Sequence, residues 1–434
     1  MESNRTLIPI IIGGSYNGYG IIRSFAEKKI KSILITHGEK AFAKASKYVE
    51  KTVILTSPDV DEGRFVQELF EFGQNLHASG LRGIIFPTHD EDVIAISKNK
   101  NKLEAFFDIP FSGWDVCSKI MDKTNFAEVC KKIGVPTIPE KLIYSFEEGL
   151  ALLDSLNLPL FIKANIWDVN LVNIFGGKNV VFYEKDKFID YIKKYFKYCP
   201  GGSLLVQKYI EESNVLNPNI NCVSDKNGNI VAVHFGEKIR QYPPKTGTST
   251  AFRSIDINTR KDMDIILDYA KRIMSEFKFY GLSGIEFLYD SKEKSYRVIE
   301  MNLRSEFTNY LQLVGGQNMP YYLYKYCKNE DYTIPYFTPK PYYTIFVPFN
   351  DRFYALHLNK IKDEDYCLSK REWRNSLGKK HEKYGLTPKD IKAYISEYKR
   401  LVWSGINAFL RKKNDIPDNI STVNYFKGRI RKEK

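Results

Sequence analysis

The sequence has few of the residues that build disulfide frameworks, zinc sites and membrane spans. Its six cysteines and six histidines are scattered, and no two cysteines form a CxxC pair. This spacing argues against a disulfide framework or a structural zinc site and indicates a reducing compartment. No run reaches the roughly 18 apolar residues of a membrane-spanning helix. The apolar run 7–12 is too short for a signal peptide and leads straight into glycines, so we predict a strand there and a cytoplasmic protein.

What is present is an ordinary globular composition with an uneven charge. The 434 residues are 43% hydrophobic and 27% charged, and a chain of this length exceeds one compact core, so we expect about two to four units. The formal net charge of +13 lies mostly at the end of the chain, where residues 340–434 carry 22 lysines and arginines against 11 acidic residues. The main body is therefore nearly neutral.

Residues 7–115 alternate apolar runs with helix-like segments, a pattern typical of a parallel α/β sheet. The first strand is followed by GGSYNGYG, residues 13–20, whose glycines either let backbone N–H groups approach an anion or simply make a tight turn. The spacing is not GxGxxG, which disfavours a dinucleotide site. The fourth strand ends in PTHDE, residues 87–91, at the sheet edge where ligands bind, and we expect Thr88 or Asp90 to cap the next helix.

The stretch GIEFLYDSKEKSYRVIEMNLR predicts a hairpin of two short strands joined by the polar loop 291–295. Closing the hairpin symmetrically places Glu286 opposite Glu300 and Gly284 opposite Asn302. Directly opposed side chains lie about 5 Å apart, and like charges there repel. Two carboxylates and an amide oxygen in this arrangement need a cation, and hard oxygen ligands favour Mg²⁺. The alternative is a surface hairpin whose glutamates point to water.

Basic residues stand at positions suited to phosphate. Asp122 is predicted to cap a helix whose first turn contains Lys123, and a cation at this positive end of the helix dipole suggests an anionic partner. Lys163 interrupts an apolar strand, where burial is costly without a partner. The segment 170–178 predicts a glycine-containing hairpin able to fold over a polyphosphate, and KIRQYPPKTGTST is basic and flexible. For each lysine alone, a solvated side chain is the simpler interpretation.

Taken in order, these motifs resemble the ATP-grasp superfamily over roughly residues 115–325. The features are DK before a helix, a strand lysine, a glycine loop, a QxYI-type hinge and paired acids in E-x-N-x-R. Within the superfamily, KIRQYPPKTGTST and the IIGGSYNGYGIIRSF opening are most similar to D-aspartate ligase-like carboxylate–amine ligases. The resemblance implies a mixed α/β and α+β fold. It divides the chain into an N-terminal open parallel α/β domain (1–115), an ATP-grasp domain of two α+β subdomains (116–330, with a lid at about 140–206) and a basic, largely helical C-terminal region (331–434).

The resemblance also implies roles for individual residues around ATP and two Mg²⁺ ions. Arg304 would stabilise the transferring phosphoryl group, and Lys238 and Arg240 would face the γ-phosphate and the acceptor carboxylate. The metal ions would be held by Glu286, Glu300 and Asn302, the phosphates by Lys123 and Lys163 under a lid containing Gly176 and Gly177, and the adenosine by Gln207, Lys208, Tyr209, Ile210 through its backbone N–H, Glu211 and Asn214.

Two parts of the sequence depart from the family pattern. Lys208 stands where the hinge normally has a glutamate, and Asn214 stands where an acid usually holds the ribose, with Glu211 or Glu212 as substitutes. Leu303 replaces the familiar proline after the asparagine, and the SEFTNYL that follows lacks the usual arginine. The acceptor pocket therefore differs from the family pattern.

The activity that the resemblance implies is ligation of a carboxylate to an amine, with an amino acid as the expected amine. ATP would convert the carboxylate to an acyl phosphate, and the products would include ADP and phosphate. A cell-envelope peptide or polysaccharide precursor is the expected setting. The alternatives are a ligase for a small soluble metabolite and a nucleotide-sensing protein without turnover. A biotin-dependent carboxylase is disfavoured because no carrier domain follows.

The C-terminal region begins with strand-like YYTIFVPF and then becomes helical and basic. Apolar residues recur at helical spacing among its lysines and arginines, namely Ile391, Tyr394, Ile395, Tyr398, Leu401, Val402, Ile406 and Phe409. Most such helices pack on the body of the protein with a solvated basic face. The alternative is a helix that lies on an anionic membrane surface and docks to a lipid-linked or glycan precursor. The protein would then be peripheral at the inner face of the membrane. Nucleic acid is the least favoured partner, since no recognised binding module accompanies the charge.

Overall fold

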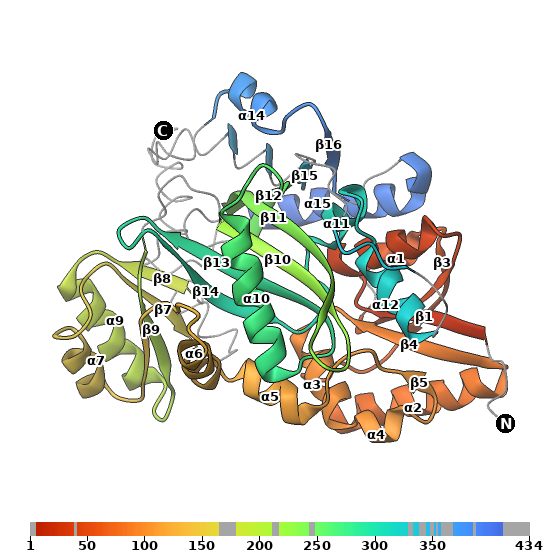
Figure 1. Ribbon diagram of the computed structural model, residues 1–434, viewed down its shortest axis with the longest axis horizontal. Helices are drawn as coiled ribbons and strands as arrows, with labels where there is room; N and C mark the ends of the chain where they lie inside the picture. Colours follow the sequence, from red (N-terminus) through yellow and green to blue (C-terminus); the bar gives the residue numbers. More distant parts are fainter. Residues whose placement is uncertain are drawn as a thin grey trace.

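The computed structural model describes residues 6–38, 41–164, 179–210, 217–242, 248–328, 333–337, 344–347, 351–352, 355–356, 368–384 and 388–410, with side chains in the last helix placed to residue 401. The strands among these residues form three sheets (Figure 1). Within the same ranges, no helix combines the length and the apolar character needed to cross a membrane.

The first sheet is the parallel unit predicted from the sequence, with the order β3-β2-β1-β4-β5 and parallel pairing throughout. Its strands are β1 (Thr6–Ile12), β2 (Ser32–Thr36), β3 (Val49–Ile54), β4 (Leu81–Pro87) and β5 (Phe107–Asp108). The helices between them are α1 (Tyr16–Ala26), η1 (Phe42–Ala45), α2 (Glu62–Ala78), α3 (Asp90–Lys98) and α4 (Lys100–Leu103). All but the first residue of β1 are buried, as expected for the centre of a parallel sheet.

The turn after β4 differs from the prediction. His89 occupies the N-cap of α3, and no side chain caps the helix there. The hydroxyl of Thr88 instead donates a hydrogen bond to the carbonyl oxygen of Ile12 at 2.8 Å, and Asp90 accepts from Arg304. The expected cap is wrong because both side chains bond to more distant parts of the chain. Gly13 is required by this arrangement, because its φ is +110° and a Cβ there would lie 2.0 Å from Thr88 Oγ1.

The second sheet has the order β6-β9-β7-β8 and lies at one end of the molecule, on the left of Figure 1. The elements that lead into it and form it are α5 (Trp114–Met121), α6 (Lys123–Lys132), β6 (Glu140–Ile143), α7 (Phe146–Leu152), β7 (Leu160–Ala164), β8 (Asn179–Phe182), α9 (Lys185–Tyr198) and β9 (Leu204–Lys208). Ile162, Phe188 and Val206 belong to a buried cluster contained within this unit. This small sheet therefore has a core of its own.

The third sheet has seven strands in the order β14-β13-β10-β11-β12-β15-β16. Its first part consists of β10 (Asn217–Ser224), β11 (Ile230–Tyr242), β12 (Thr248–Ser254), α10 (Met263–Phe277), β13 (Gly281–Asp290) and β14 (Ser295–Asn302). The chain continues through α11 (Asn309–Val314), α12 (Met319–Cys327), β15 (Thr344–Phe346), α14 (Lys370–Ser376), β16 (His381–Lys383), η4 (Pro388–Asp390) and α15 (Ile391–Leu410). The C-terminal region thus adds two strands to this sheet as well as helices.

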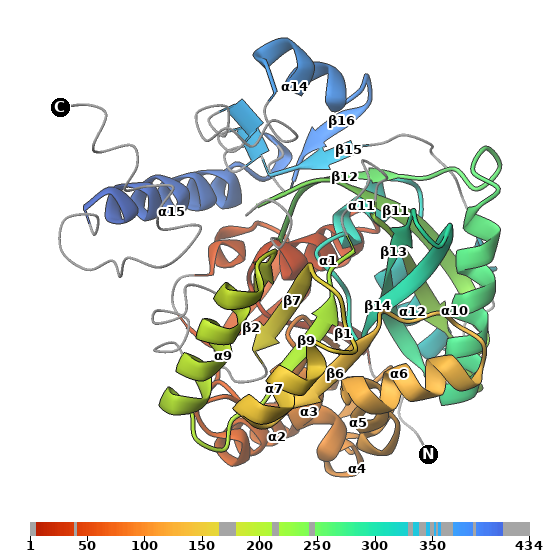
Figure 2. The ribbon, with the colours of Figure 1, turned by 90° about the vertical axis from the view of Figure 1, so that its left-hand side faces the viewer.

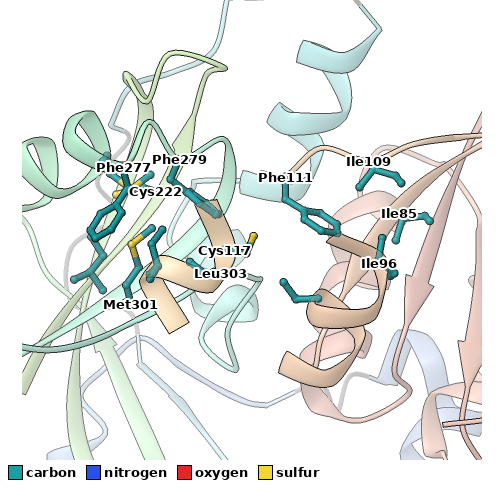
Figure 3. Close-up of a cluster of buried hydrophobic side chains, with 14 of the residues drawn as sticks. Ile85, Ile96, Ile109, Phe111, Cys117, Cys222, Phe277, Phe279, Met301 and Leu303 are labelled. Atoms are coloured by element: carbon teal, nitrogen blue, oxygen red, sulfur yellow. The ribbon is translucent and has the colours of Figure 1, made fainter. Parts of the chain in front are cut away.

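One hydrophobic core joins the first sheet to the third (Figure 3). It contains Ile85 and Ile96 from the N-terminal unit, Cys117 from α5, and Phe277 and Met301 from the third sheet and its helix. Side chains of both units are therefore buried together. This shared core holds the carboxyl edge of the first sheet beside the β13–β14 hairpin.

Helix α1 packs closely on α11, and a glycine makes this contact possible. A Cβ at Gly20 would lie 1.7 Å from Oδ1 of Asn309. Asn309 is fully buried and donates hydrogen bonds to the carbonyl oxygen of Asn17 at 2.6 Å and to Ser305 Oγ at 3.0 Å. The amide group therefore has little room to move aside.

We expect Gly20→Ala to lower the thermal unfolding midpoint. Overpacking costs about 1–3 kcal/mol, which exceeds the gain of up to about 1 kcal/mol from replacing a helical glycine. The matched control is Gly38→Ala, because nothing lies within 4 Å of a Cβ at Gly38. Differential scanning fluorimetry of both variants checks the prediction, which is wrong if Gly20→Ala is as stable as the control.

Candidate active site

The β13–β14 hairpin has the predicted register, with Gly284 opposite Asn302 and Glu286 opposite Glu300. The turn is one residue shorter than expected, because β13 extends to Asp290 and β14 starts at Ser295. The pairing shifts by one residue between Glu286 and Phe287, so Ile299 forms a bulge that restores the predicted pairing at the acidic residues. The two carboxylates therefore lie on adjacent strands.

Lysines from two other elements neutralise this acidic pair. Lys163 of β7 donates a hydrogen bond from Nζ to Glu300 Oε2 at 3.1 Å. Burial would raise the pKa of Glu300, but Lys163 and Lys123 outweigh burial and lower it. Burial raises the pKa of Glu286, Lys238 opposes this change, and Glu300 adds to it. Glu300 is thus held as the anion, and the two carboxylates have unequal proton affinities.

Lys123 is the first residue of α6, and its neighbour Asp122 caps the helix by accepting a hydrogen bond from the backbone N–H of Asn125. Burial and the charge of Lys163 lower the pKa of Lys123 to about 8. The charge of Glu300 overcomes burial and raises the pKa of Lys163. The two ammonium groups therefore repel each other, and a polyanion between them would relieve that repulsion.

A third carboxylate, which sequence reasoning missed, lies beside the pair. Glu306 is buried and accepts hydrogen bonds from Asn302 Nδ2 at 2.7 Å and from Asn219 Nδ2 at 3.2 Å. A Cβ at Gly284 would lie 1.9 Å from its carboxyl carbon, so only glycine fits opposite Asn302. Burial, with the charge of Glu286, raises the pKa of Glu306 to about 7.

The residues present fit a hard divalent cation. Glu286 pairs across the strands with Glu300 on one side and with Asn219 on the other, and Oδ1 of Asn219 is buried with no hydrogen-bond partner among the described residues. Among the described residues, no three His, Cys, Asp or Glu side chains converge well enough to hold a metal by themselves. Mg²⁺ is usually bound by one or two carboxylates together with phosphate oxygens, and Glu286 and Glu300 supply two carboxylates on adjacent strands.

Arg304 connects this site to the N-terminal sheet. Its Nε donates to Asp90 Oδ1 at 2.7 Å, and its Nη2 donates to Asp90 Oδ2 at 3.2 Å. Asp90 belongs to the PTHDE motif at the carboxyl edge of the first sheet. The motif predicted to lie where ligands bind is therefore beside the acidic hairpin.

Comparison with known proteins finds similar proteins for this part of the chain. Residues 122–311 match the family model of the carbamoyl-phosphate synthase L chain, ATP binding domain. The biotin carboxylase domain of 2-oxoglutarate carboxylase from Hydrogenobacter thermophilus, solved with MgADP, ADP and bicarbonate, superposes with a TM-score of 0.57 at 18% identity over 77% of this chain and 73% of that one. Residues 122–311 are thus similar to that ATP-binding domain, and the chain shares the fold of the biotin carboxylase domain.

Two further relatives are ligases. D-aspartate ligase of Enterococcus faecium is 23% identical over 327 residues, which is 73% of this chain and 75% of that protein. L-amino acid ligase from Bacillus licheniformis superposes with a TM-score of 0.53 at 16% identity, covering 73% of each chain. The carbamoyl phosphate synthase large chain of Pyrococcus furiosus is 22% identical over 303 residues, but the match spans only 26% of that protein.

The nucleotide-binding residues inferred from the resemblance lie partly within the described structure. Lys208 and Tyr209 use their backbone N–H groups for hydrogen bonds to Pro139 and Pro159 at 2.9 Å. Gln207 donates to Glu140, and Ile210 is buried with Ile138 and Leu288. Gly176, Gly177, Glu211 and Asn214 lie outside the described residues. Gln207 and Lys208 therefore end β9, and Tyr209 and Ile210 follow directly, so the segment expected to be the hinge lies at the end of the small sheet.

Arg240 differs from the role inferred for it. Its guanidinium forms a two-point ion pair with Asp351, at 2.8 and 2.7 Å, and its Nη1 donates to Ser376 Oγ at 2.5 Å. Asp351 is fully buried. A guanidinium occupied in this way is unsuited to bind a substrate carboxylate, and it joins β11 to the C-terminal region. Lys238 stands two residues earlier, and its positive charge lowers the pKa of Glu286. It therefore remains in the proposed site.

A charged network also lies at the carboxyl edge of the first sheet. Asp92 is buried, and its carboxylate lies 2.7 Å from His37 Nε2 and 3.3 Å from His89 Nδ1. Burial opposes protonation of His37, but the hydrogen bond and charge of Asp92 outweigh it and raise the pKa of His37. Burial would raise the pKa of Asp92 as well, yet the two histidines lower it.

This network predicts a pH-dependent contribution to stability. Because the pKa of His37 is raised on folding, its contribution is complete below about pH 6.5, the ordinary value, and is lost as pH rises through the folded pKa. We expect His37→Asn to lower the unfolding midpoint more at pH 6 than at pH 8.5. Thermal scans at both values test this, with exposed His381→Asn as the control. An equal loss at both pH values contradicts the prediction.

Proposed function

We propose that this protein is an ATP-dependent ligase that joins a carboxylate to the amine of an amino acid, with ADP and phosphate as products. The observation that carries the proposal is the convergence of Glu286 and Glu300 with Lys123 and Lys163 from separate elements. Two carboxylates beside two ammonium groups suit a nucleoside triphosphate with its metal ions, because the carboxylates can bind the metal and the lysines the phosphates. The D-aspartate ligase and L-amino acid ligase relatives supply the reaction class.

A carboxylate is a poor electrophile, and the site suits its activation. The carboxylate oxygen attacks the γ-phosphorus of ATP, the bond to the β–γ bridging oxygen breaks, and ADP leaves with that electron pair. The amine then attacks the acyl phosphate, expels phosphate and loses a proton. Bound Mg²⁺ would supply positive charge to the phosphoryl oxygens. The residues that would hold it are Glu286, Glu300 and Asn302, and two ions are expected from the resemblance.

The chain's other groups position and neutralise the phosphates. Lys123 and Lys163 are held on α6 and β7. Their positive charges would therefore already be in place beside the phosphoryl group when it is transferred. Arg304 is oriented by Asp90 and lies near enough to Glu300 for its charge to lower the pKa of that residue. Lys238 would face the γ-phosphate. The small sheet, with Gly176 and Gly177 in its lid, would close over the site to keep water from the acyl phosphate. Residues 207–214 would surround the adenosine.

The proposed setting is modification of a cell-envelope peptide or polysaccharide precursor by a cytoplasmic enzyme. A ligase for a small soluble metabolite is the second candidate, and the 2-oxoglutarate carboxylase relative favours a small carboxylate. ADP release with each amino acid, in the presence of envelope precursors or of small carboxylates, separates the two.

The decisive experiment is amine-dependent ADP formation by wild type and Glu300→Gln. We expect the variant to lose at least about a hundredfold in kcat, the size of effect typical for loss of one group that stabilises transition-state charge. The matched control is Glu293→Gln, which removes an exposed acid from the turn of the same hairpin and should leave the rate unchanged. A wild-type protein that binds ATP yet forms no ADP with any amine and carboxylate pair would instead be a nucleotide sensor.

A further inference from the structure

The last helix, α15, is fixed on the N-terminal unit by its inner face. Ala393 and Glu397 are fully buried, and the helix packs on η1. Asp390, just before the helix, accepts hydrogen bonds from Tyr19 OH at 2.9 Å and from Ser46 Oγ at 2.5 Å. Glu397 is bonded to Arg400 at 2.5 and 2.6 Å. These contacts determine which face of the helix is turned outward.

The outward face carries an apolar stripe. Ile391, Ile395 and Tyr398 are 61%, 46% and 55% exposed, and their spacing of four and three residues places them in one line on a helix. Elsewhere among the described residues, no helix carries more than one of the exposed large hydrophobic residues, and single ones need no explanation. Three in a line on a helix that is already packed on its other side indicate a second contact.

Lysines border this stripe. Lys392 and Lys399 are exposed and lie seven residues apart, on the same side of the helix. The sole acidic residue in 391–401, Glu397, points inward and is paired. The outward side of α15 is therefore apolar along its centre and positive along one flank. Lysines can bury their methylene chains beside an apolar surface while the ammonium groups meet anions.

We propose that α15 is a peripheral membrane-binding helix that lies along a bilayer containing anionic lipids, with Ile391, Ile395 and Tyr398 in the headgroup region and Lys392 and Lys399 at lipid phosphates. A bilayer fits better than a protein partner, because the stripe is a single line on a convex helix rather than a broad patch or groove. Figure 2 shows α15 at the periphery of the molecule. The inference does not depend on the proposed ligase activity.

The test is co-sedimentation of the full chain with vesicles of phosphatidylcholine alone or of phosphatidylcholine and phosphatidylglycerol in a two-to-one ratio. We expect at least about tenfold stronger partitioning to the anionic vesicles, reduced by high salt. Ile391→Ser with Ile395→Ser should remove most of it. The matched control is Ile265→Ser on α10, since Ile265 is 47% exposed and far from the stripe in sequence.

The contribution of the lysines is tested with the double variant Lys392→Glu and Lys399→Glu, which should bind anionic vesicles about tenfold more weakly. Lys193→Glu with Lys194→Glu on α9 makes the same charge change at another exposed pair and should have no effect. Failure to bind, equal binding to neutral vesicles, or binding unaffected by the isoleucine changes overturns the proposal. So does a dimer in light scattering that Ile395→Ser dissociates, because the stripe would then be an interface between copies. Binding to soluble dextran sulfate in preference to vesicles would identify a polyanion site and also overturn it.

Discussion

Two carboxylates held opposite each other on adjacent strands repel, and the surrounding site is arranged around that repulsion. Glu286 and Glu300 cannot separate, because the β13–β14 ladder determines their spacing. Lys163 and Lys123 approach from a different sheet and from α6, and the net effect on Glu300 is a lowered pKa. The lysines in turn repel each other, which contributes to the low pKa of Lys123. A ligand that brings both cations and anions, such as a metal–triphosphate complex, satisfies both repulsions at once.

The same hairpin explains why glycine stands at position 284. Its missing side chain leaves space for the carboxyl group of Glu306, which is bonded to Asn302 on the opposite strand. Arg304 follows directly and is oriented by Asp90 from the N-terminal unit. The Glu286–Glu300 pair, the third carboxylate and the arginine therefore all depend on the register of one β-hairpin. The core shared between α5, β4 and β14 holds the two units at the distance that the Arg304–Asp90 pair needs (Figure 3).

The parts that could be predicted from the sequence are those set by local rules. Alternation of strands and helices predicted the parallel first sheet, and counting outward from a turn predicted Glu286 opposite Glu300. That count assumed a turn one residue too long, and the bulge at Ile299 compensated for it. The contacts that were missed join distant residues: Arg304 with Asp90, Arg240 with Asp351, and Glu306 with Asn219. No periodicity or capping rule links such positions, because tertiary packing brings them together.

The C-terminal region illustrates how folding changes the meaning of a charge count. Its sequence holds 22 basic and 11 acidic residues, yet three of those acidic residues are buried and bonded inside the protein. Asp351 pairs with Arg240, Asp390 is bonded to Tyr19 and Ser46, and Glu397 is bonded to Arg400, and all three are at most 1% exposed. The acids hold the region to the body, whereas lysines such as Lys392 and Lys399 remain outside. Among the described residues of this region, the outward face is therefore more positive than composition alone suggests, and this is the charge that a partner surface would meet.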